Sequence, residues 1–204
     1  MEIVDSGDDA VLVLLADAPG DAATDVVLGL WRALVAAAPA WLIAAQPAYT
    51  TLQVSFAADV DVDDVRAFLR ALSPRPLTSA PRVVEVPVRY GGDNGPDLGD
   101  VAVHARLPIA EVVRRHTSGR YRVAFCGFLP GFAYLLGLDG ALHTPRLSTP
   151  RALVPAGSVG IAGGQTGVYP SACPGGWRLI GRTERALGPE WIAADDVVVF
   201  RSVS

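Results

Sequence analysis

The sequence predicts an α+β protein of two domains, a small α/β domain over residues 1–80 and a β-barrel domain over residues 81–204. Three observations support this prediction. Helix-like and strand-like apolar spacings alternate along the first part of the chain. A stretch with three prolines interrupts the pattern near residue 80 and cannot continue a helix. The second part has short strand-like runs between many glycines and prolines, which is typical of a barrel.

The first domain is predicted to begin with a buried strand at residues 11–15, followed by a helix that begins at Thr24 and ends before Pro39. The helix has apolar positions at the i, i+3, i+4 and i+7 spacing of a one-faced helix: Val27, Leu30, Trp31 and Leu34. Two further strands, residues 41–44 and 50–56, are expected to form a hairpin through Pro47.

A second helix of this domain is predicted to begin after Asp61, because an aspartate at that position can cap the helix and the next residues are acidic. Its apolar face is expected to contain Val65, Phe68, Leu69 and Leu72. The resulting order, β-α-β-β-α, resembles a split β-α-β sandwich, provided that one more strand completes it.

The proline-containing stretch at residues 73–81 is the expected linker. After it, Val84, Val86 and Val88 alternate as in a strand, and Pro87 indicates an edge strand. Residues 91–96 are expected to form an exposed loop. Beyond the loop, one helix is predicted to begin at Pro108 and to end at Gly119, plugging or flanking the barrel. The helix would place Ile109, Val112, Val113 and His116 on one face.

Composition excludes several classes of function. The net charge is −4 and no basic run could follow a phosphate backbone, so nucleic acid is not an expected partner. No apolar run approaches the ~20 residues of a membrane span, and no secretory leader is present, so we expect a cytoplasmic protein without a membrane partner. Cys126 and Cys173 are expected to be buried free thiols, and the three histidines lack metal-ligand spacing, so no metal site is expected.

All 17 basic residues are arginine. Without lysine, the chain has no Schiff-base residue and no lysine-containing phosphate loop. Any anion that this chain holds by itself must therefore contact arginine, a backbone N–H or a helix N-terminus.

The densest group of turn-forming and polar residues lies between residues 127 and 183. Here Pro145-Arg146 and Pro150-Arg151 present two guanidinium groups on a stiff segment, a pattern that favours an anion site. Two simpler interpretations remain open. The glycines and prolines could serve the corners of a barrel, and each arginine could pair with an acid such as Asp139 or Glu111.

Other residues of the second domain have competing interpretations. His116, in the last turn of its helix, is either an acid/base group or a buried structural histidine. Ser158 lies in a segment near the Gly-x-Ser-x-Gly nucleophile motif, but the first glycine is missing. Residues 157–167 could instead form a backbone concavity for an anion. Tyr169 and Trp177 could equally anchor a protein interface.

Six segments of the second domain resemble the family of the 5-oxoprolinase B subunit, which is also labelled allophanate hydrolase subunit 1 or the KipI histidine-kinase inhibitor. The first eighty residues fit this family only in length and pattern. The matching segments are VPVRYGGDNGPDL (86–98), HTSGRYRV (116–123), GFLPGFAYL (127–135), PRLSTPR (145–151), VPAGSVGIAGGQTGVYP (154–170) and PGGWRLIGRT (174–183).

The resemblance implies a cyclophilin-like barrel in a heteromer with the C subunit of 5-oxoprolinase. Together with the A subunit, this complex would open 5-oxo-L-proline to L-glutamate at the expense of ATP, which would be bound with Mg²⁺ by the complex. The chain would be inactive alone. It departs from the family at Glu184, where a proline is usual, and in a shortened stretch before Asp195 and Asp196, which puts contacts of the tail in doubt.

Such chemistry needs anion clamps and a proton carrier. Arg146 and Arg151 are the expected clamps, His116 is the expected acid/base group, and Ser158, Gln165 and Tyr169 are expected to orient the amide substrate. The alternatives are a non-catalytic inhibitor of a sensor histidine kinase and a component of urea or allophanate hydrolysis.

Overall fold

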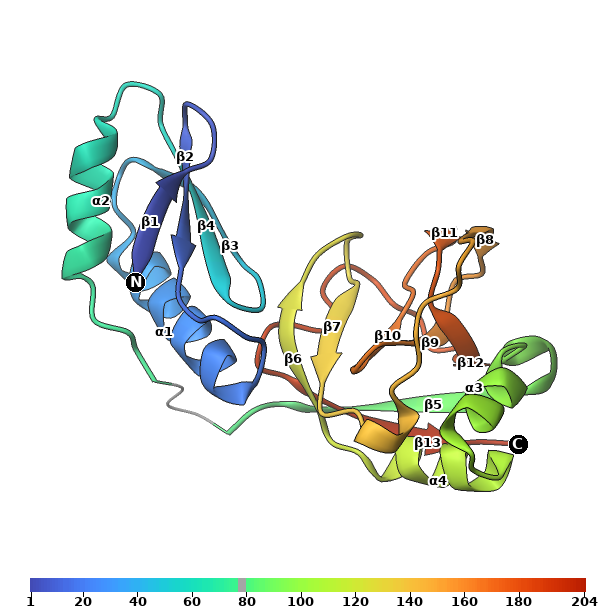
Figure 1. Ribbon diagram of the computed structural model, residues 1–204. Helices are drawn as coiled ribbons and strands as arrows, with labels where there is room; N and C mark the ends of the chain where they lie inside the picture. Colours follow the sequence, from blue (N-terminus) through green and yellow to red (C-terminus); the bar gives the residue numbers. More distant parts are fainter. Residues whose placement is uncertain (77–79) are drawn as a thin grey trace. The chain divides into compact units, whose positions relative to one another are not determined.

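The computed structural model describes residues 1–76 and 80–204 and divides into two compact units, Met1–Ala80 and Pro81–Ser204 (Figure 1). The linker expected over residues 73–81 includes residues 77–79, which lie outside the described residues. Among the residues that the structure describes, no helix combines the length and the apolar character that crossing a membrane requires.

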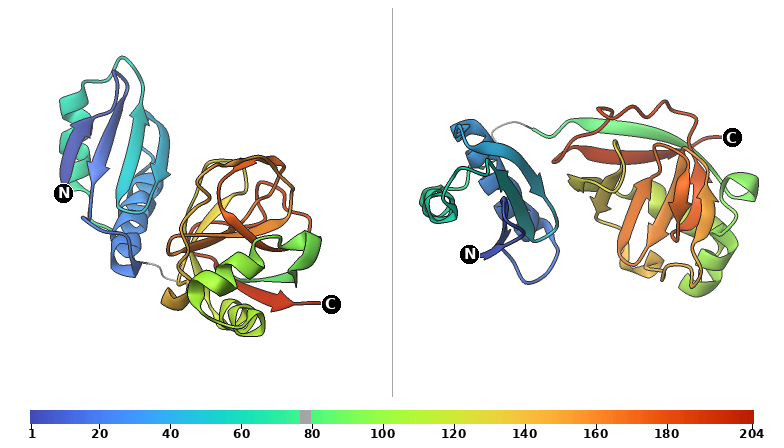
Figure 2. Two further views of the ribbon diagram at one scale, coloured as in Figure 1. Left: turned by 45° about the vertical axis from the view of Figure 1, so that its right-hand side comes forward. Right: turned by 90° about the horizontal axis from the view of Figure 1, so that it is seen from above.

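The first unit is a four-stranded antiparallel sheet with two helices on one of its faces (Figure 2). The strand order is β1-β2-β4-β3. The elements are β1 (Glu2–Asp5), β2 (Ala10–Leu14), α1 (Asp21–Ala37), β3 (Leu42–Pro47), β4 (Thr51–Phe56) and α2 (Val62–Ala71).

The split β-α-β arrangement is confirmed in this unit. Strands β2 and β3 both run antiparallel to β4, which lies between them, so they are parallel to each other and are connected through α1. The completing strand is β1, which pairs with β2 at the start of the chain. The sequence analysis did not identify β1, because its four residues alternate only weakly and none is fully buried.

The core of the first unit follows the predicted apolar faces. Leu52, Val54 and Phe56 point to the same side of β4 and are fully or almost fully buried. They pack with Leu34 of α1 and Leu69 of α2. The burial of these side chains in one cluster fixes both helices on that side of the sheet.

The second unit is a closed seven-stranded barrel of order β10-β7-β6-β13-β5-β12-β9, with a separate two-stranded ribbon, β11-β8. This confirms the predicted α+β class and the barrel. The strands are β5 (Val83–Tyr90), β6 (Tyr121–Cys126), β7 (Ala133–Leu136), β8 (Arg151–Val154), β9 (Ser158–Ala162), β10 (Gln165–Val168), β11 (Cys173–Gly175), β12 (Arg178–Arg182) and β13 (Val197–Ser202).

Strand β5 is not the edge strand that Pro87 indicated. It pairs in parallel with β13 from Val83 to Val88, and β12 pairs with it on the other side only at Arg89 and Tyr90. Pro87 lies outside the β12 ladder, so its missing N–H removes no hydrogen bond there. The barrel thus accommodates a proline in an internal strand.

The second unit has two α-helices where the sequence analysis predicted one. Helix α3 (Leu98–Ala105) precedes α4 (Ile109–Ser118); the two helices pack together, α3 beside β12 and α4 beside β13 (Figure 1). The expected loop at residues 91–96 contains a short 3₁₀ turn, η1 (Gly92–Asn94); a second one is η2 (Gly140–Leu142). Glycine is required at Gly95, where a Cβ atom would lie 2.1 Å from the carbonyl oxygen of Ile180.

Two buried aspartates hold the start of β13. Asp195 accepts a hydrogen bond of 2.6 Å from Arg122 Nη2, and Asp196 forms an ion pair with Arg82. Because both carboxylates lie almost out of contact with water, each needs such a partner. The segment that the sequence marks as shortened is therefore tied to the barrel.

The two cysteines differ in exposure. Both thiols are free, and Cys173 is buried as predicted. Cys126 is exposed, which corrects the expectation that both would be buried. It is the last residue of β6, beyond the residues Tyr121, Val123 and Ala124 that this strand buries.

Candidate functional site

A cavity of about 230 Å³ opens beside the β11-β8 ribbon of the second unit. Its wall is largely aromatic and contains one charged residue. It is lined by Phe128, Phe132, Tyr134, Arg146, Pro150, Tyr169, Pro174, Gly175, Gly176 and Trp177. A pocket of mainly apolar surface with a few polar groups is the usual form of a small-molecule site.

The aromatic wall is a packed cluster around Phe132. The ring of Phe132 makes edge contacts with Tyr134, Tyr169 and Trp177, at centroid distances of 5.1, 5.3 and 5.5 Å. Phe132, Tyr169 and Trp177 are buried, and together with Cys173 they belong to a hydrophobic cluster separate from the barrel core. Close packing of this kind holds each ring in one orientation, so the cavity is preformed.

The two tyrosines of the wall remain protonated at neutral pH. Burial raises the pKa of Tyr169 to about 12, and this rise is opposed by a hydrogen bond from the Trp177 backbone and by the charge of Arg146. Burial also raises the pKa of Tyr134, again against the charge of Arg146. Both phenols can therefore donate hydrogen bonds to a ligand but are poor bases.

Arg146 provides the only charge among the residues that line this cavity. Its side chain forms no ion pair or hydrogen bond with any residue in the described ranges 1–76 and 80–204, and the residue is exposed. A guanidinium group without a protein carboxylate beside an apolar wall is suited to bind an anionic group of a ligand.

The structure does not bring Arg151 to this cavity. Its Nη2 donates a hydrogen bond of 2.7 Å to Oδ1 of Asp97, which is 5% exposed. The other oxygen of Asp97 accepts a hydrogen bond of 2.7 Å from the backbone N–H of Leu179. Arg151 thus neutralises the buried carboxylate next to α3, and the two arginines do not form the expected clamp.

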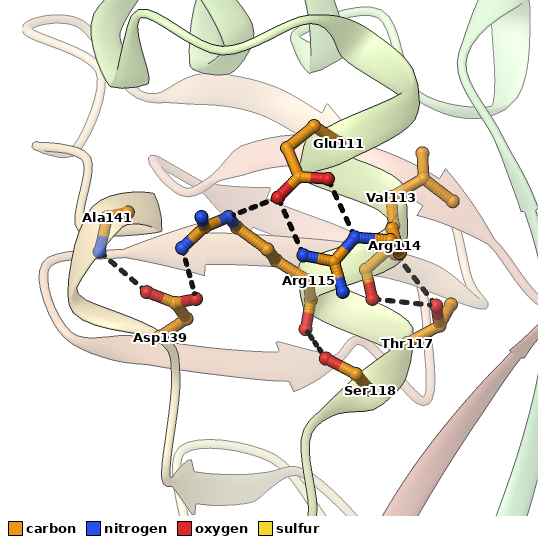
Figure 3. A network of polar contacts seen from close by, with 8 residues as sticks. All are labelled: Glu111, Val113, Arg114, Arg115, Thr117, Ser118, Asp139 and Ala141. Atoms are coloured by element: carbon orange, nitrogen blue, oxygen red, sulfur yellow. Dashed lines mark hydrogen bonds and ion pairs between the residues drawn. The ribbon is translucent and has the colours of Figure 1, made fainter.

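The acids proposed as alternative partners of these arginines belong to another network, on α4 (Figure 3). Glu111 accepts hydrogen bonds of 2.7 Å from both Arg114 and Arg115. Asp139 accepts one of 2.8 Å from Arg115. Hydrogen bonds from the two arginines lower the pKa of Glu111 to about 2, and neither acid contacts Arg146 or Arg151.

His116 lies in the barrel core and does not line the cavity. It is 0% exposed, and burial lowers its pKa to about 3, so the imidazole is neutral. Its Nε2 is 2.9 Å from Oγ1 of Thr166, which donates its own proton to the carbonyl of Gly160. Nε2 must therefore carry the proton, and Nδ1 accepts a hydrogen bond of 2.7 Å from the hydroxyl of Tyr90.

Of the other predicted site residues, one lines the cavity and two do not. Tyr169 lines the cavity beside Arg146. Ser158 is buried in β9, opposite Arg182 of β12, and Gln165 begins β10 opposite Ala162. Neither Ser158 nor Gln165 lines the aromatic cavity.

The sequence analysis did not identify Phe128, Phe132 and Tyr134 as site residues, although the segment that contains them was singled out as a family motif. Phe128 is unusual, since it is 60% exposed and has a φ of 72°, a left-handed conformation that is rare for an aromatic residue. The signal in the sequence that could have identified them is the aromatic residues on both sides of Pro130-Gly131. Strain of this kind is concentrated at functional sites.

Comparison with known proteins places this chain in a family. A family model described as carboxyltransferase domain, subdomain C and D, matches residues 1–190. The 5-oxoprolinase B subunit of Escherichia coli O157:H7 is 59% identical over 120 residues, which are 59% of this chain and 54% of that protein. The 5-oxoprolinase B subunit of Bacillus subtilis (strain 168) is 50% identical over 129 residues, 60% of this chain and 54% of that protein. The matches thus span about half the length of these relatives.

Solved structures show the same fold. The protein TTHA0988 superposes with a TM-score of 0.85 at 33% identity, over 96% of this chain and 40% of that chain. The conserved uncharacterized protein PH0987 from Pyrococcus horikoshii gives a TM-score of 0.58 at 36% identity, over 100% and 98% of the two chains. The Kluyveromyces lactis urea amidolyase gives 0.79 over 99% of this chain and 15% of that chain, but at 15% identity it is similar in fold alone.

The family match over nearly the whole chain agrees with the resemblance that the motifs of the second unit indicate, and this chain belongs to the family of the carboxyltransferase domain, subdomain C and D, with 5-oxoprolinase B subunits among its relatives.

Proposed function

We propose that this chain acts as the B subunit of a heteromeric, ATP-dependent 5-oxoprolinase and that its aromatic cavity binds 5-oxo-L-proline. The observation that supports this most directly is the unpaired guanidinium of Arg146 beside the rings of Phe132 and Trp177. 5-Oxoproline is a small, flat lactam with one carboxylate. The carboxylate would pair with Arg146, and the ring methylenes would pack on the aromatic wall.

The phenols of Tyr134 and Tyr169 would donate hydrogen bonds to the lactam oxygen, since both have a raised pKa and keep their protons. The reaction needs more than binding. ATP would phosphorylate the lactam oxygen, and water would add to the activated carbon. The ring C–N bond would then break as the nitrogen takes a proton. This leaves an acyl phosphate, which a second water hydrolyses to glutamate and phosphate.

The cavity lining includes no carboxylate, histidine or cysteine among the residues that the structure describes. A proton carrier for ring opening would therefore have to come from another polypeptide. This supports a role in which the chain binds and orients the lactam while the C and A subunits supply the remaining groups. It also accounts for the expectation that the chain is inactive alone.

The test is steady-state kinetics of the chain co-expressed with the C and A subunits. In the Arg146→Gln complex, the KM for 5-oxoproline should rise about 10- to 100-fold, the value of a charge-assisted hydrogen bond to a carboxylate. Turnover of 2-pyrrolidone, which lacks the carboxylate, should be the same for Arg146→Gln and wild type.

Arg120→Gln is the matched control, because Arg120 is exposed and does not line the cavity. Arg120→Gln should leave the KM for 5-oxoproline and the turnover of 2-pyrrolidone unchanged. An unchanged KM for 5-oxoproline in Arg146→Gln would rule out Arg146 as the carboxylate site, and no ATP-dependent formation of glutamate by the wild-type complex would refute the proposed activity.

One feature favours the second candidate function, inhibition of a sensor histidine kinase. Phe128, which lines the cavity, and Leu153, which lies on strand β8 of the neighbouring ribbon, are 60% and 65% exposed. Exposed apolar side chains of this size are typical of docking surfaces. A regulator would reduce kinase autophosphorylation when the purified chain is added, with no need for ATP-dependent lactam opening. The urea or allophanate alternative is tested by offering those amides to the same complex.

A further inference from the structure

A second cavity of about 460 Å³ lies in the barrel unit and shares no lining residue with the aromatic cavity. Its lining is mainly polar and comes mostly from the segments that connect strands. The lining residues are Asn94, Ala156, Gly157, Pro170, Arg182, Thr183, Glu184, Arg185, Ala186 and Leu187.

The two arginines of this cavity lack carboxylate partners in the described part of the chain. Arg182 Nε donates a hydrogen bond of 2.9 Å to the carbonyl of Ala156, and Arg185 Nη1 donates one of 2.7 Å to the carbonyl of Glu85. A carbonyl oxygen accepts a hydrogen bond but carries no net charge, so both positive charges stay uncompensated.

The acid in the lining does not neutralise them. Glu184 forms its ion pair with Arg89, at 2.6 Å, and Arg89 itself lies opposite Arg182 in the β5-β12 ladder. Glu184 therefore offsets the charge of Arg89, which leaves the cavity with the positive charge of Arg182 and Arg185. An anion bound in the cavity would offset this charge.

The backbone around these arginines is held tightly. Gly157 has a φ of 80°, and a Cβ atom there would lie 2.2 Å from the carbonyl oxygen of Thr183. The N–H of Thr183 donates to the carbonyl of Gly157 at 2.9 Å, and the hydroxyl of Thr183 accepts from the N–H of Arg185 at 3.1 Å. Both guanidinium groups thus extend from a preformed backbone, which lowers the entropic cost of binding a ligand between them.

We propose that this second cavity binds the phosphate groups of a small molecule. Two uncompensated guanidinium groups match the charge of a di- or triphosphate better than that of a monocarboxylate, and arginine forms bidentate hydrogen bonds with phosphate oxygens. The phosphate chain of ATP is the natural occupant. That identification rests on the proposed function, whereas the assignment of phosphate chemistry rests on the cavity alone.

The test is isothermal titration of the full chain with inorganic tripolyphosphate and, separately, with ATP. Tripolyphosphate should bind, and its affinity should fall as salt concentration rises. Arg182→Gln and Arg185→Gln should each weaken binding about tenfold, the lower range for a charge-assisted hydrogen bond. Arg201→Gln is the control, because Arg201 is exposed, pairs with Glu85 and does not line the cavity.

ATP binding tighter than tripolyphosphate would show that the nucleoside also contacts the chain, and equal binding would show that the phosphates alone are recognised; both results support the site. Failure of tripolyphosphate to bind, or unchanged affinity in the two cavity variants, would overturn it. Because Arg182→Gln removes a contact to Ala156 and could disturb folding, Glu184→Gln provides a second measurement. This variant removes the nearby negative charge and frees Arg89, so it should strengthen tripolyphosphate binding about threefold.

The same variants separate this inference from the proposed function. Arg182→Gln and Arg185→Gln should leave binding of 5-oxoproline to the aromatic cavity unchanged, and Arg146→Gln should leave tripolyphosphate binding unchanged. A loss of both ligands in one variant would indicate a folding defect, which the thermal unfolding midpoint of that variant would reveal.

Discussion

Arg146 and Arg151 have the same proline-arginine sequence context, but their surroundings give them different physical roles. Arg146 lies on the loop before β8 and lines an aromatic cavity without a carboxylate partner in the described chain. Arg151 begins β8 and pairs with Asp97, whose carboxylate is almost fully buried. The first arginine is free to bind a ligand, while the second is needed to keep a buried charge satisfied.

Arg151→Ala should reduce the free energy of unfolding by about 3 kcal/mol, because it leaves the Asp97 carboxylate buried without its cation. Urea denaturation at pH 7 measures this loss. The matched control is Arg178→Ala, whose partner Asp100 is 66% exposed, so the expected loss is at most about 1 kcal/mol. Equal effects of the two substitutions would contradict a structural role specific to Arg151.

The sequence analysis named residues of this site but could not place all of them. Tyr169 was predicted to orient the substrate, and it lines the cavity with Arg146. Arg151 and His116 have partners, Asp97 and Tyr90, that are 54 and 26 residues away along the chain. No local pattern predicts such distant pairs, because they depend on how the barrel closes.

At the scale of single elements, α2 shows how local signals fix a helix start. Asp61 accepts a hydrogen bond of 2.8 Å from the N–H of Asp63, which satisfies one of the free donors of the first turn. The apolar face then buries Val65 and Leu69 against the sheet. The predicted cap and the predicted face are both confirmed.

Asp61→Ala should destabilise the first unit by about 1 kcal/mol, the usual value of an N-cap side chain. Thermal unfolding followed by circular dichroism gives the shift. Asp59→Ala is the control, because Asp59 is exposed and precedes the cap, so it should have no measurable effect. If Asp59→Ala lowers the midpoint as much as Asp61→Ala, the effect arises from net charge and not from capping.

Elements were missed where local residues disfavour the structure that tertiary contacts impose. Helix α3 follows Gly95 and Pro96 and contains Gly99, residues that favour turns, yet it forms because Leu98, Val101 and Ala102 are buried on one face. Strand β5 was predicted, but as an edge strand; it tolerates Pro87 inside the barrel because the β12 ladder does not reach that residue. Local propensity is a weak guide wherever packing of the whole barrel decides.

At the scale of the whole molecule, each unit has a hydrophobic core of its own. All three histidines, His104, His116 and His143, belong to the second unit. Tryptophans are shared between the units, with Trp31 and Trp41 in the first and Trp177 and Trp191 in the second. Acidification between pH 7 and 5.5 should therefore change the stability of the two units differently. Tryptophan fluorescence can follow the unfolding of each unit.

The second unit should lose stability as the pH falls below 6.5, because the pKa of His116 is lowered to about 3 in the folded state. Between these two values the unfolded chain binds a proton that the folded core excludes, so the loss from His116 is about 1.4 kcal/mol per pH unit. Urea unfolding of a Trp31→Phe/Trp41→Phe variant, monitored by the tryptophans of the second unit, measures this slope at pH 7, 6.5, 6 and 5.5.

His116→Gln should lower stability at pH 7, since it disturbs the hydrogen bonds with Tyr90 and Thr166, but it should remove most of the pH slope. The carboxylates remain in both proteins, so the difference between their slopes isolates the imidazole. His143→Gln is the matched control and should keep the wild-type slope, because it leaves the buried imidazole of His116 in place. A slope that persists in His116→Gln would show that the buried imidazole is not the group through which acid destabilises the barrel.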